Sequence, residues 1–376
     1  MGAVSRKPRV LMVGPFPPTK GGVTTFMMNV IGSDLSNRFD FVAHTTSRPP
    51  KKNVVDNYGY AAMFKGGIGR LLHAGWVTLW HLLTFPFVLV FRRIDLVQIQ
   101  SSDFQTFWES CLYLMMAKLF RRRTMLRLGG VFDKFYEGSS PRVQALIRRG
   151  IAAPDILIVQ SESWRAYLAG VGRTDNVIIL YNSVPEVSIV PVDAPRNDPP
   201  KVLFFAGSES VRKGAQVVLE ALQSPALRNL QAHYRFFAVI DPLKSQIERA
   251  GLAQSHDLTD FMDHAAFLAE LRQGDIFLMP SFGEGFPNSL LEAMAAGLAC
   301  VVTPVGAVPE IADHGVEALV MPPGDAATLA DHIAELVQDA DRRLAMVQAA
   351  QDRVRRQFTA EAVLARLEDG YRELLA

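Results

Sequence analysis

The sequence lacks the features that define several large classes of protein. Its formal net charge is only +1 over 376 residues, so no overall positive charge favours nucleic-acid binding. It has two cysteines, Cys111 and Cys300, both in apolar sequence, which is typical of core residues in a reducing compartment and not of a disulfide framework. The apolar run near the start is short and ends in prolines, so it predicts a buried strand and no secretory signal.

Signatures of cofactors and metals are also missing. No G-x-G-x-x-G motif follows a predicted strand, and the sequence GGIG at residues 66–69 does not match it, so no nicotinamide cofactor is expected. No group of histidine, cysteine and carboxylate residues has the spacing of metal ligands. We therefore expect neither a cofactor nor a bound metal.

The apolar residues are instead arranged as short runs that alternate with helical segments. This alternation predicts a mainly parallel sheet with crossover helices. In the first half the predicted strands are 9–14, 39–45, 95–100, 124–130 and 155–161, and the predicted helices are 22–35, 71–91, 108–120 and 140–151. In the second half the strands are 201–207, 234–240, 275–280 and 300–304, and the helices are 214–223, 244–250 and 288–296.

A segment rich in proline, residues 183–200, interrupts this alternation and predicts an interdomain linker. The predicted fold is therefore α/β, with two Rossmann-like domains, residues 1–182 and 201–358, facing a central cleft that would hold the ligand. A final amphipathic helix, residues 359–376, is compatible with packing on either domain.

Residues 71–91 carry no formal charge and raise the question of a membrane. The stretch is long enough to span a bilayer, but it contains two histidines and Pro86, and a predicted strand follows at once. A buried helix or a helix lying at the membrane interface is therefore favoured over a span. Arginine runs lie at 92–93, 121–123 and 148–149; they either attract an anionic membrane or are ordinary surface charges.

The stretch SFGEGFPNSLLEAMAAG, residues 281–297, contains two glutamates near the start of a predicted helix. Pro287 suits the first turn and Gly297 the position after the end, which places the helix at 288–296. Glu284 then lies in the preceding loop and Glu292 in the second turn. The amides of residues 288–290 point out of the helix and form a candidate anion site. The alternative is ordinary capping, with Glu284 complementing the helix dipole and Glu292 facing solvent.

Two further loops between a strand and a helix are candidate ligand sites. In residues 204–222 an Arg212-Lys213 pair precedes a helix, where Lys213 is able to reach a diphosphate; the alternative is a solvated basic pair. Near the start, Gly21 and Gly22 allow close approach of the backbone to a ligand, or form a plain turn.

The segment 278–310 closely resembles the E-x7-E region of the retaining glycosyltransferases of family 4, which have the GT-B fold. The resemblance extends firmly over the second half of the chain and loosely over the first. The matching residues are Pro280, Ser281, Glu284, Gly285, Phe286, Pro287, Leu290, Leu291, Glu292, Ala293, Met294, Ala295, Gly297, Val301, Val302, Gly306, Pro309 and Glu310.

The resemblance implies roles for the candidate residues. Glu284 would contact the donor sugar, Glu292 the ribose hydroxyls and Lys213 the diphosphate, with Glu284 and Lys213 as the catalytic pair. The remaining donor-binding candidates are Gly21, Gly22, Arg212, Gly285, Phe286, Pro287, Asn288, Ser289 and Leu290.

Two positions depart from the family. Ser208 stands where an arginine usually follows the glycine, and Arg212 is a candidate replacement. The strand ending at Gly129-Gly130 lacks the family's histidine; Arg127 and Asp133 are both candidates for its place, and nothing in the sequence decides between them.

The activity implied by the resemblance is metal-independent transfer of a sugar, with retention, from a nucleoside-diphosphate sugar of the UDP or GDP type. The acceptor would be a saccharide or a lipid-linked saccharide in cell-surface polysaccharide or glycolipid assembly. The expected location is the cytoplasm, in peripheral contact with the inner face of the membrane. The alternatives are a nucleotide-sugar-binding protein without catalysis, or another GT-B enzyme such as an epimerase.

Overall fold

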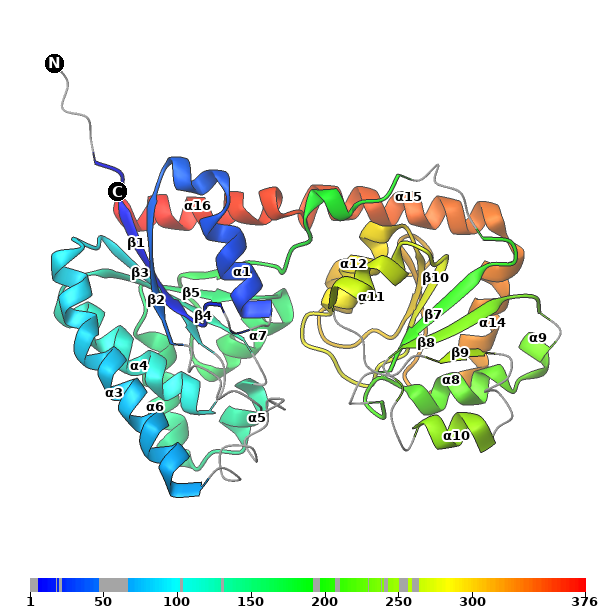
Figure 1. The fold of residues 1–376 in the computed structure, drawn as a ribbon, viewed down its shortest axis with the longest axis horizontal. Coiled ribbons are helices and arrows are strands. Elements are labelled where there is room, and N and C mark those ends of the chain that lie inside the picture. Colours follow the sequence, from blue (N-terminus) through cyan, green and yellow to red (C-terminus); the bar gives the residue numbers. More distant parts are fainter. Residues whose placement is uncertain are drawn as a thin grey trace, which may run out of the picture. The chain divides into compact units, whose positions relative to one another are not determined.

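The computed structural model consists of two compact units, each built around one β-sheet (Figure 1). Unit 1 comprises Met1–Leu180 and Leu364–Ala376, and unit 2 comprises Tyr181–Val363. The structure describes residues 6–17, 19, 22–46, 67–101, 104–129, 132–191, 197–206, 210–228, 230–237, 239, 243–249, 256–258 and 264–376.

The sheet of unit 1 has the strand order β2-β1-β3-β4-β5-β6, and each of these pairings is parallel. Its strands are β1 (Arg9–Gly14), β2 (Asp40–Thr45), β3 (Leu96–Ser101), β4 (Arg123–Leu128), β5 (Ile156–Val159) and β6 (Val177–Ile179). Its helical segments are α1 (Gly22–Ile31), η1 (Asp34–Asn37), α3 (Gly67–Phe91), α4 (Phe104–Leu119), α5 (Phe132–Glu137), α6 (Pro141–Ala152) and α7 (Glu162–Val171).

The sheet of unit 2 has the order β12-β11-β10-β7-β8-β9, again with parallel pairing. Its strands are β7 (Lys201–Phe205), β8 (His233–Phe237), β9 (His256–Leu258), β10 (Ile276–Met279), β11 (Ala299–Val302) and β12 (Ala318–Val320). Its helical segments are η2 (Glu186–Ser188), α8 (Ala215–Leu222), α9 (Pro225–Arg228), α10 (Leu243–Arg249), α11 (His264–Leu271), α12 (Asn288–Ala296), α13 (Val308–Ile311), α14 (Ala326–Gln338) and α15 (Ala340–Gln357).

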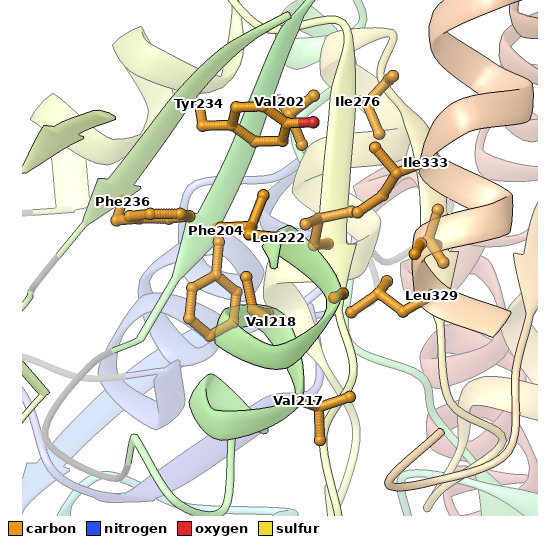
Figure 2. Packing of buried hydrophobic residues seen from close by; sticks show 14 of the residues in the cluster. Val202, Phe204, Val217, Val218, Leu222, Tyr234, Phe236, Ile276, Leu329 and Ile333 are labelled. Carbon is orange, nitrogen blue, oxygen red and sulfur yellow. The ribbon is translucent and has the colours of Figure 1, made fainter. Parts of the chain in front are cut away.

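The core of unit 2 is divided between the two faces of its sheet, because side chains alternate along each strand. Val202 and Phe204 point to the face covered by α8 and α14, where Val218 and Ile333 pack against them (Figure 2). Leu203 points to the opposite face, which α11, α12 and α15 cover. Burial of one such side chain contributes about 1.5–3 kcal/mol, so both layers hold the sheet rigid beneath the loops at its edge.

The last helix, α16 (Ala360–Leu375), contributes its residues from Leu364 onward to unit 1. Tyr371 is fully buried and packs edge-on against Phe39, with 5.1 Å between ring centroids, and its hydroxyl donates to Gln98. Of the two alternatives left open by the sequence, the structure therefore shows packing on unit 1.

The described part of the proline-rich segment groups with unit 2. The Val190 amide donates to the Ala295 carbonyl at 2.9 Å, and the Gln351 side chain donates to the Val190 carbonyl at 2.7 Å. These bonds attach the segment to α12 and α15.

The uncharged stretch 71–91 lies in α3, where Phe85 and Leu89 are fully buried against unit 1. Within the described parts of the chain, no helix combines the length and the apolar character needed to cross a membrane.

Candidate functional site

The carboxyl ends of β7 and β10 bring the candidate residues of unit 2 together. The two strands are direct neighbours in the sheet and run parallel, so the loops that follow them leave the same edge. Lys213 follows β7 and Glu284 follows β10. Strand order therefore brings two segments that are remote in sequence to the same edge of the sheet.

At this point three side chains surround the Glu284 carboxylate. Lys213 Nζ lies 2.7 Å from Oε1, Arg212 Nη1 lies 3.2 Å from Oε2, and the Ser281 hydroxyl donates to Oε1 at 2.8 Å. The Glu284 side chain is only 8% exposed. Burial by itself raises the pKa of this carboxyl, but the charge and hydrogen bond of Lys213, the bond from Ser281 and the charge of Arg212 outweigh it and hold the pKa below its ordinary value. Glu284 is therefore an ionised, positioned acceptor at neutral pH.

Backbone contacts hold the two loops against each other. The Phe282 amide donates to the Arg212 carbonyl at 2.8 Å, and Arg212 Nη1 donates to the Gly283 carbonyl. Gly214 has a φ of +77°, and a Cβ on it would lie 2.1 Å from the Pro280 carbonyl oxygen. Only glycine permits so close an approach, so the R-K-G sequence and the loop after β10 form one unit.

A second glycine supports Glu284 from the other side. Gly306 has a φ of +57°, and a Cβ there would lie 2.1 Å from the Glu284 carbonyl oxygen. The adjacent amide of Ala307 donates to the Gly285 carbonyl at 2.9 Å, and the Thr303 hydroxyl donates to the Ser281 carbonyl at 2.5 Å. The loop after β11 therefore fixes the backbone on which Glu284 is placed.

Helix α12 begins at Asn288 and ends at Ala296, as the sequence predicts, and Gly297 follows in the left-handed conformation with a φ of 84°. One part of the prediction for its first turn is wrong. The amide of Leu290 is not open, because it donates to the Pro287 carbonyl at 3.1 Å in a tight first turn. Among the described residues, the amides of Asn288 and Ser289 have no backbone acceptor, so these two are the candidate anion donors at this helix end.

The other residues of the turn between the two glutamates have distinct environments. Phe286 and Pro287 are buried, with the Phe286 ring 5.6 Å from that of Tyr181, whereas Gly285 and Asn288 are exposed. The Asn182 side chain donates to Asn288 Oδ1 at 2.8 Å. A small hollow at the carboxyl end of β10 is lined in part by Lys213, Ser281 and Ser289. Gly285 and the first turn of α12 are thus accessible beside the cationic pair.

Glu292 does not face open solvent, contrary to the simple capping alternative. Its side chain is 14% exposed and its Oε1 lies 2.8 Å from His264 Nε2 at the start of α11. The His264 side chain is itself 66% exposed. Glu292 therefore has a partner that lies on the surface.

The candidates in unit 1 are less completely defined. Gly22 is the first residue of α1, whereas Gly21 and Gly130 lie outside the described residues. In unit 2, Ser208 lies outside them as well. Of the two residues considered for the family's histidine, Arg127 is 2% exposed on β4 with its guanidinium 4.4 Å from the centre of the Phe26 ring. Burial lowers the pKa of Arg127 to about 10.

Asp133, the other residue considered, is half-buried in the first turn of α5. The Tyr167 hydroxyl donates to its backbone carbonyl at 3.4 Å. Neither position favours one of the two residues, Arg127 or Asp133, as the replacement for the family's histidine.

The geometry of unit 2 agrees with a comparison against known families. Residues 199–339 match the family model of the group 1 glycosyl transferases. The matched segment contains Lys213, Glu284 and Glu292, together with the strands and helices that position them.

Individual relatives and solved structures extend the comparison. The putative colanic acid biosynthesis glycosyltransferase WcaL of Escherichia coli strain K12 is 27% identical over 238 residues, which are 60% of this chain and 57% of that protein. The chain therefore matches little more than half the length of this relative.

The sucrose-phosphate synthase of Thermosynechococcus elongatus superposes with a TM-score of 0.73 at 15% identity, covering 98% of this chain and 99% of that one. Anabaena Alr3699/HepE, solved in complex with UDP, gives a TM-score of 0.72 at 15% identity, covering 97% and 100%. These likenesses confirm the predicted GT-B fold class.

Several residues of the site were not singled out from the sequence. Asn182 and His264 reach it from segments that carry no motif, and Thr303 lies within the segment 278–310 but is not one of its matched residues; their contacts appear only in the fold. Ser281 and Gly306 were matched as part of the family pattern, but their contacts with Glu284 follow from no local signal.

Proposed function

We propose that this protein is a glycosyltransferase that moves a sugar from a nucleoside-diphosphate sugar to an acceptor hydroxyl. The observation that carries the proposal is the cluster of Lys213, Arg212 and Glu284 beside the first turn of α12. Two cations and two backbone amides suit a diphosphate, while an ionised carboxylate among them suits a sugar hydroxyl. The family match over residues 199–339 supports the same activity.

In the proposed reaction the bond between the anomeric carbon and the diphosphate oxygen breaks, and the acceptor oxygen forms a bond to the same carbon. Negative charge grows on the leaving diphosphate, and the positioned Lys213 ammonium and helix-end amides stabilise it. The acceptor oxygen attacks from the face that the diphosphate leaves, so the configuration is retained, and the acceptor's proton passes to the leaving phosphate oxygen. The Glu292 carboxylate accepts hydrogen bonds from the ribose hydroxyls of the donor.

Lys213 and Arg212 supply the positive charge that a divalent cation supplies in other diphosphate sites, so we propose that the reaction needs no metal. Turnover in the presence of EDTA then stays within about twofold of the untreated rate, since the cations belong to the protein. Activity that disappears with EDTA and returns with Mg²⁺ contradicts this part of the proposal.

The acceptor class is proposed from the chain's own chemistry and from its relatives. A relative named for colanic acid biosynthesis suggests a saccharide or lipid-linked saccharide of the cell surface. The free thiols of Cys111 and Cys300 suit the cytoplasm, and the arginine-flanked helix α3 suits the inner face of a membrane.

The deciding experiment is a thermal-shift screen of UDP- and GDP-sugars, followed by product analysis with the donor that stabilises most. A ligand that binds only the folded protein raises its melting temperature, so the screen identifies the donor without knowledge of the acceptor. A new glycosidic bond with the donor's anomeric configuration, seen by NMR, supports the proposal. Binding without transfer supports the non-catalytic alternative, and free nucleotide with an altered sugar supports the epimerase alternative.

A further inference from the structure

The outer face of α3 is apolar and exposed to solvent. Trp76, Trp80, Leu83, Phe87 and Phe91 are 62%, 57%, 55%, 63% and 76% exposed. At about 100° per residue, these five positions lie within a stripe about 80° wide on one side of the helix. The opposite side carries the fully buried Phe85 and Leu89, which anchor α3 to the core of unit 1.

Helix α4 continues this apolar surface. It packs beside α3 on the flank of unit 1 (Figure 1). Its Leu112, Met115 and Leu119 are 42%, 65% and 79% exposed, at a spacing that also places them on one side of their helix. Together with the stripe on α3 they form what we call the α3–α4 face. The four aromatic side chains of the stripe on α3 are about 60–75% exposed, and by themselves they expose on the order of 500 Å² of apolar surface. This area is near the upper limit for one apolar patch on a soluble monomer.

Basic residues lie at one end of the α3–α4 face. Both helices run against the direction of the strands, so both end at the amino edge of the sheet, where Leu96 of β3 pairs with Arg123 of β4. Arg92 and Arg93 follow α3, and the run 121–123 follows α4. Arg92, Arg93, Arg121 and Arg123 are exposed.

The acidic residues of the same edge are already paired with other cations. Asp95 pairs with Arg6 at 2.8 Å, Asp40 with Arg9 at 2.7 Å, and Asp155 with Lys118 at 3.0 Å. Among the described residues, no acidic side chain forms an ion pair with the arginines at the ends of α3 and α4. The two helices themselves contain one acidic residue, Glu109 of α4. The edge therefore keeps a positive charge directed outward.

We infer that the α3–α4 face docks on the surface of an anionic lipid bilayer. The apolar stripe would enter the boundary between headgroups and acyl chains, where the amphipathic rings of Trp76 and Trp80 are favoured. The arginines at the end of both helices would lie at the level of the anionic headgroups. A second copy of the same face has only Glu109 to offer these arginines, whereas anionic headgroups match them, so the bilayer is the occupant that fits both halves of the surface.

This inference gives a location to the membrane contact of the proposed function, but its test does not depend on that function. Purified full-length protein is sedimented with vesicles of phosphatidylcholine alone, and of phosphatidylcholine with added phosphatidylglycerol, at low and high salt. Binding is expected with the anionic vesicles at low salt, and we expect it to fall as salt rises. A blue shift of tryptophan fluorescence should accompany it.

Two paired variants test the two halves of the surface. The pair Trp80→Gln and Phe87→Gln removes exposed rings, and the pair Arg121→Gln and Arg123→Gln removes charge; each is expected to weaken binding about tenfold or more. Leu344→Gln, on the 41% exposed Leu344 of α15, and Arg356→Gln, on the same helix, are the matched controls and should bind as the unmodified protein does.

Each variant is checked for folding by its melting temperature. A variant counts as folded if the nucleoside diphosphate found in the donor screen still raises that temperature, or, where no nucleotide binds, if the temperature equals that of the unmodified protein. No sedimentation of the unmodified protein with anionic vesicles overturns the inference. So does equal binding by folded variants. A dimer in sedimentation velocity that the Trp80→Gln and Phe87→Gln pair converts to monomer, without vesicle binding, assigns the face to self-association instead.

Discussion

Lys213 and Glu284 are 71 positions apart in the sequence, and the Lys213 Nζ lies 2.7 Å from a Glu284 carboxylate oxygen. Among the described residues of the two loops, the only other charged one in an ion pair with them is Arg212, next to Lys213 in sequence, which also contacts Glu284. The ion pair exists because β7 and β10 are neighbours and two glycines allow the loops to touch. The following experiments separate its roles in chemistry and in stability.

Replacing Lys213 with alanine should remove much of the catalytic rate. If the ammonium stabilises the leaving diphosphate, kcat falls about 10²–10³-fold, equivalent to about 2.7–4 kcal/mol, and Lys213→Arg restores part of it. The measurement is steady-state turnover of the donor found by the thermal-shift screen. Lys201 pairs with Glu270 in the same unit and is 18% exposed, against 16% for Lys213, so Lys201→Ala is the matched control. An unchanged kcat in Lys213→Ala contradicts the assignment.

Lowering the pH should weaken unit 2 through Glu284. Because the folded protein holds the pKa of Glu284 below its ordinary value, the ionised carboxylate stabilises the fold above pH about 4.3, and this contribution is lost as pH falls through the folded pKa. The melting temperature of Glu284→Gln is therefore expected to lie below that of the unmodified protein at pH 7, with the gap closing in acid. Calorimetry from pH 7 to pH 3 measures it, and a gap that stays constant argues against an ionised Glu284.

Glu292 should contribute to nucleotide affinity through the ribose. A hydrogen bond to a charged group is worth about 1.5–3 kcal/mol, so Glu292→Gln is expected to raise the Kd of the nucleoside diphosphate by about 10- to 100-fold in titration calorimetry. A 2′,3′-dideoxy analogue should bind both proteins equally. His264→Ala removes the present partner of Glu292 and should change the Kd by less than about fivefold, since the His264 side chain is 66% exposed and a pair with so exposed a partner contributes about 1 kcal/mol or less. Equal losses for both nucleotides would assign Glu292 a structural role only.

Gly306→Ala should destabilise the protein and displace Glu284. A left-handed backbone costs an alanine about 1–3 kcal/mol, and here the added Cβ would also lie 2.1 Å from the Glu284 carbonyl oxygen. Gly324 has a similar φ of +82° but its Cβ would meet only ring atoms of Phe282 at 3.5 Å and beyond, so Gly324→Ala reports the backbone cost alone. Urea unfolding should show the larger loss in Gly306→Ala, together with weaker donor binding. Equal losses in the two variants would show that the loop tolerates the added atom.

The sequence predicted those parts of the fold that depend on strong local signals. Helix α12 has the predicted bounds because Pro287 and Gly297 mark its ends, and the alternation of strands and helices gave the parallel sheets. The three-residue strands β6, β9 and β12 were missed, because so short a run has no measurable periodicity.

The candidate site was predicted in its residues but not in its contacts. Parallel strands imply that loops after β7 and β10 share an edge, yet the direct ion pair depends on the close approach at Gly214. The contact of His264 with Glu292 joins two helices, α11 and α12, and nothing in the sequence around His264 indicates it. The tight first turn at Pro287 that uses the Leu290 amide likewise reflects backbone geometry that residue types alone do not determine.

The packing of α16 has a consequence for how the chain is made. Most of unit 1 is translated before unit 2, yet Tyr371, which is buried in unit 1 beside Phe39, is translated after unit 2. Until Tyr371 has been translated, its side chain cannot cover the apolar surface around Phe39, although unit 2 is already being made. Translation of the segment Leu364–Ala376 is thus the step that supplies the last described part of unit 1, after the whole of unit 2 has been made.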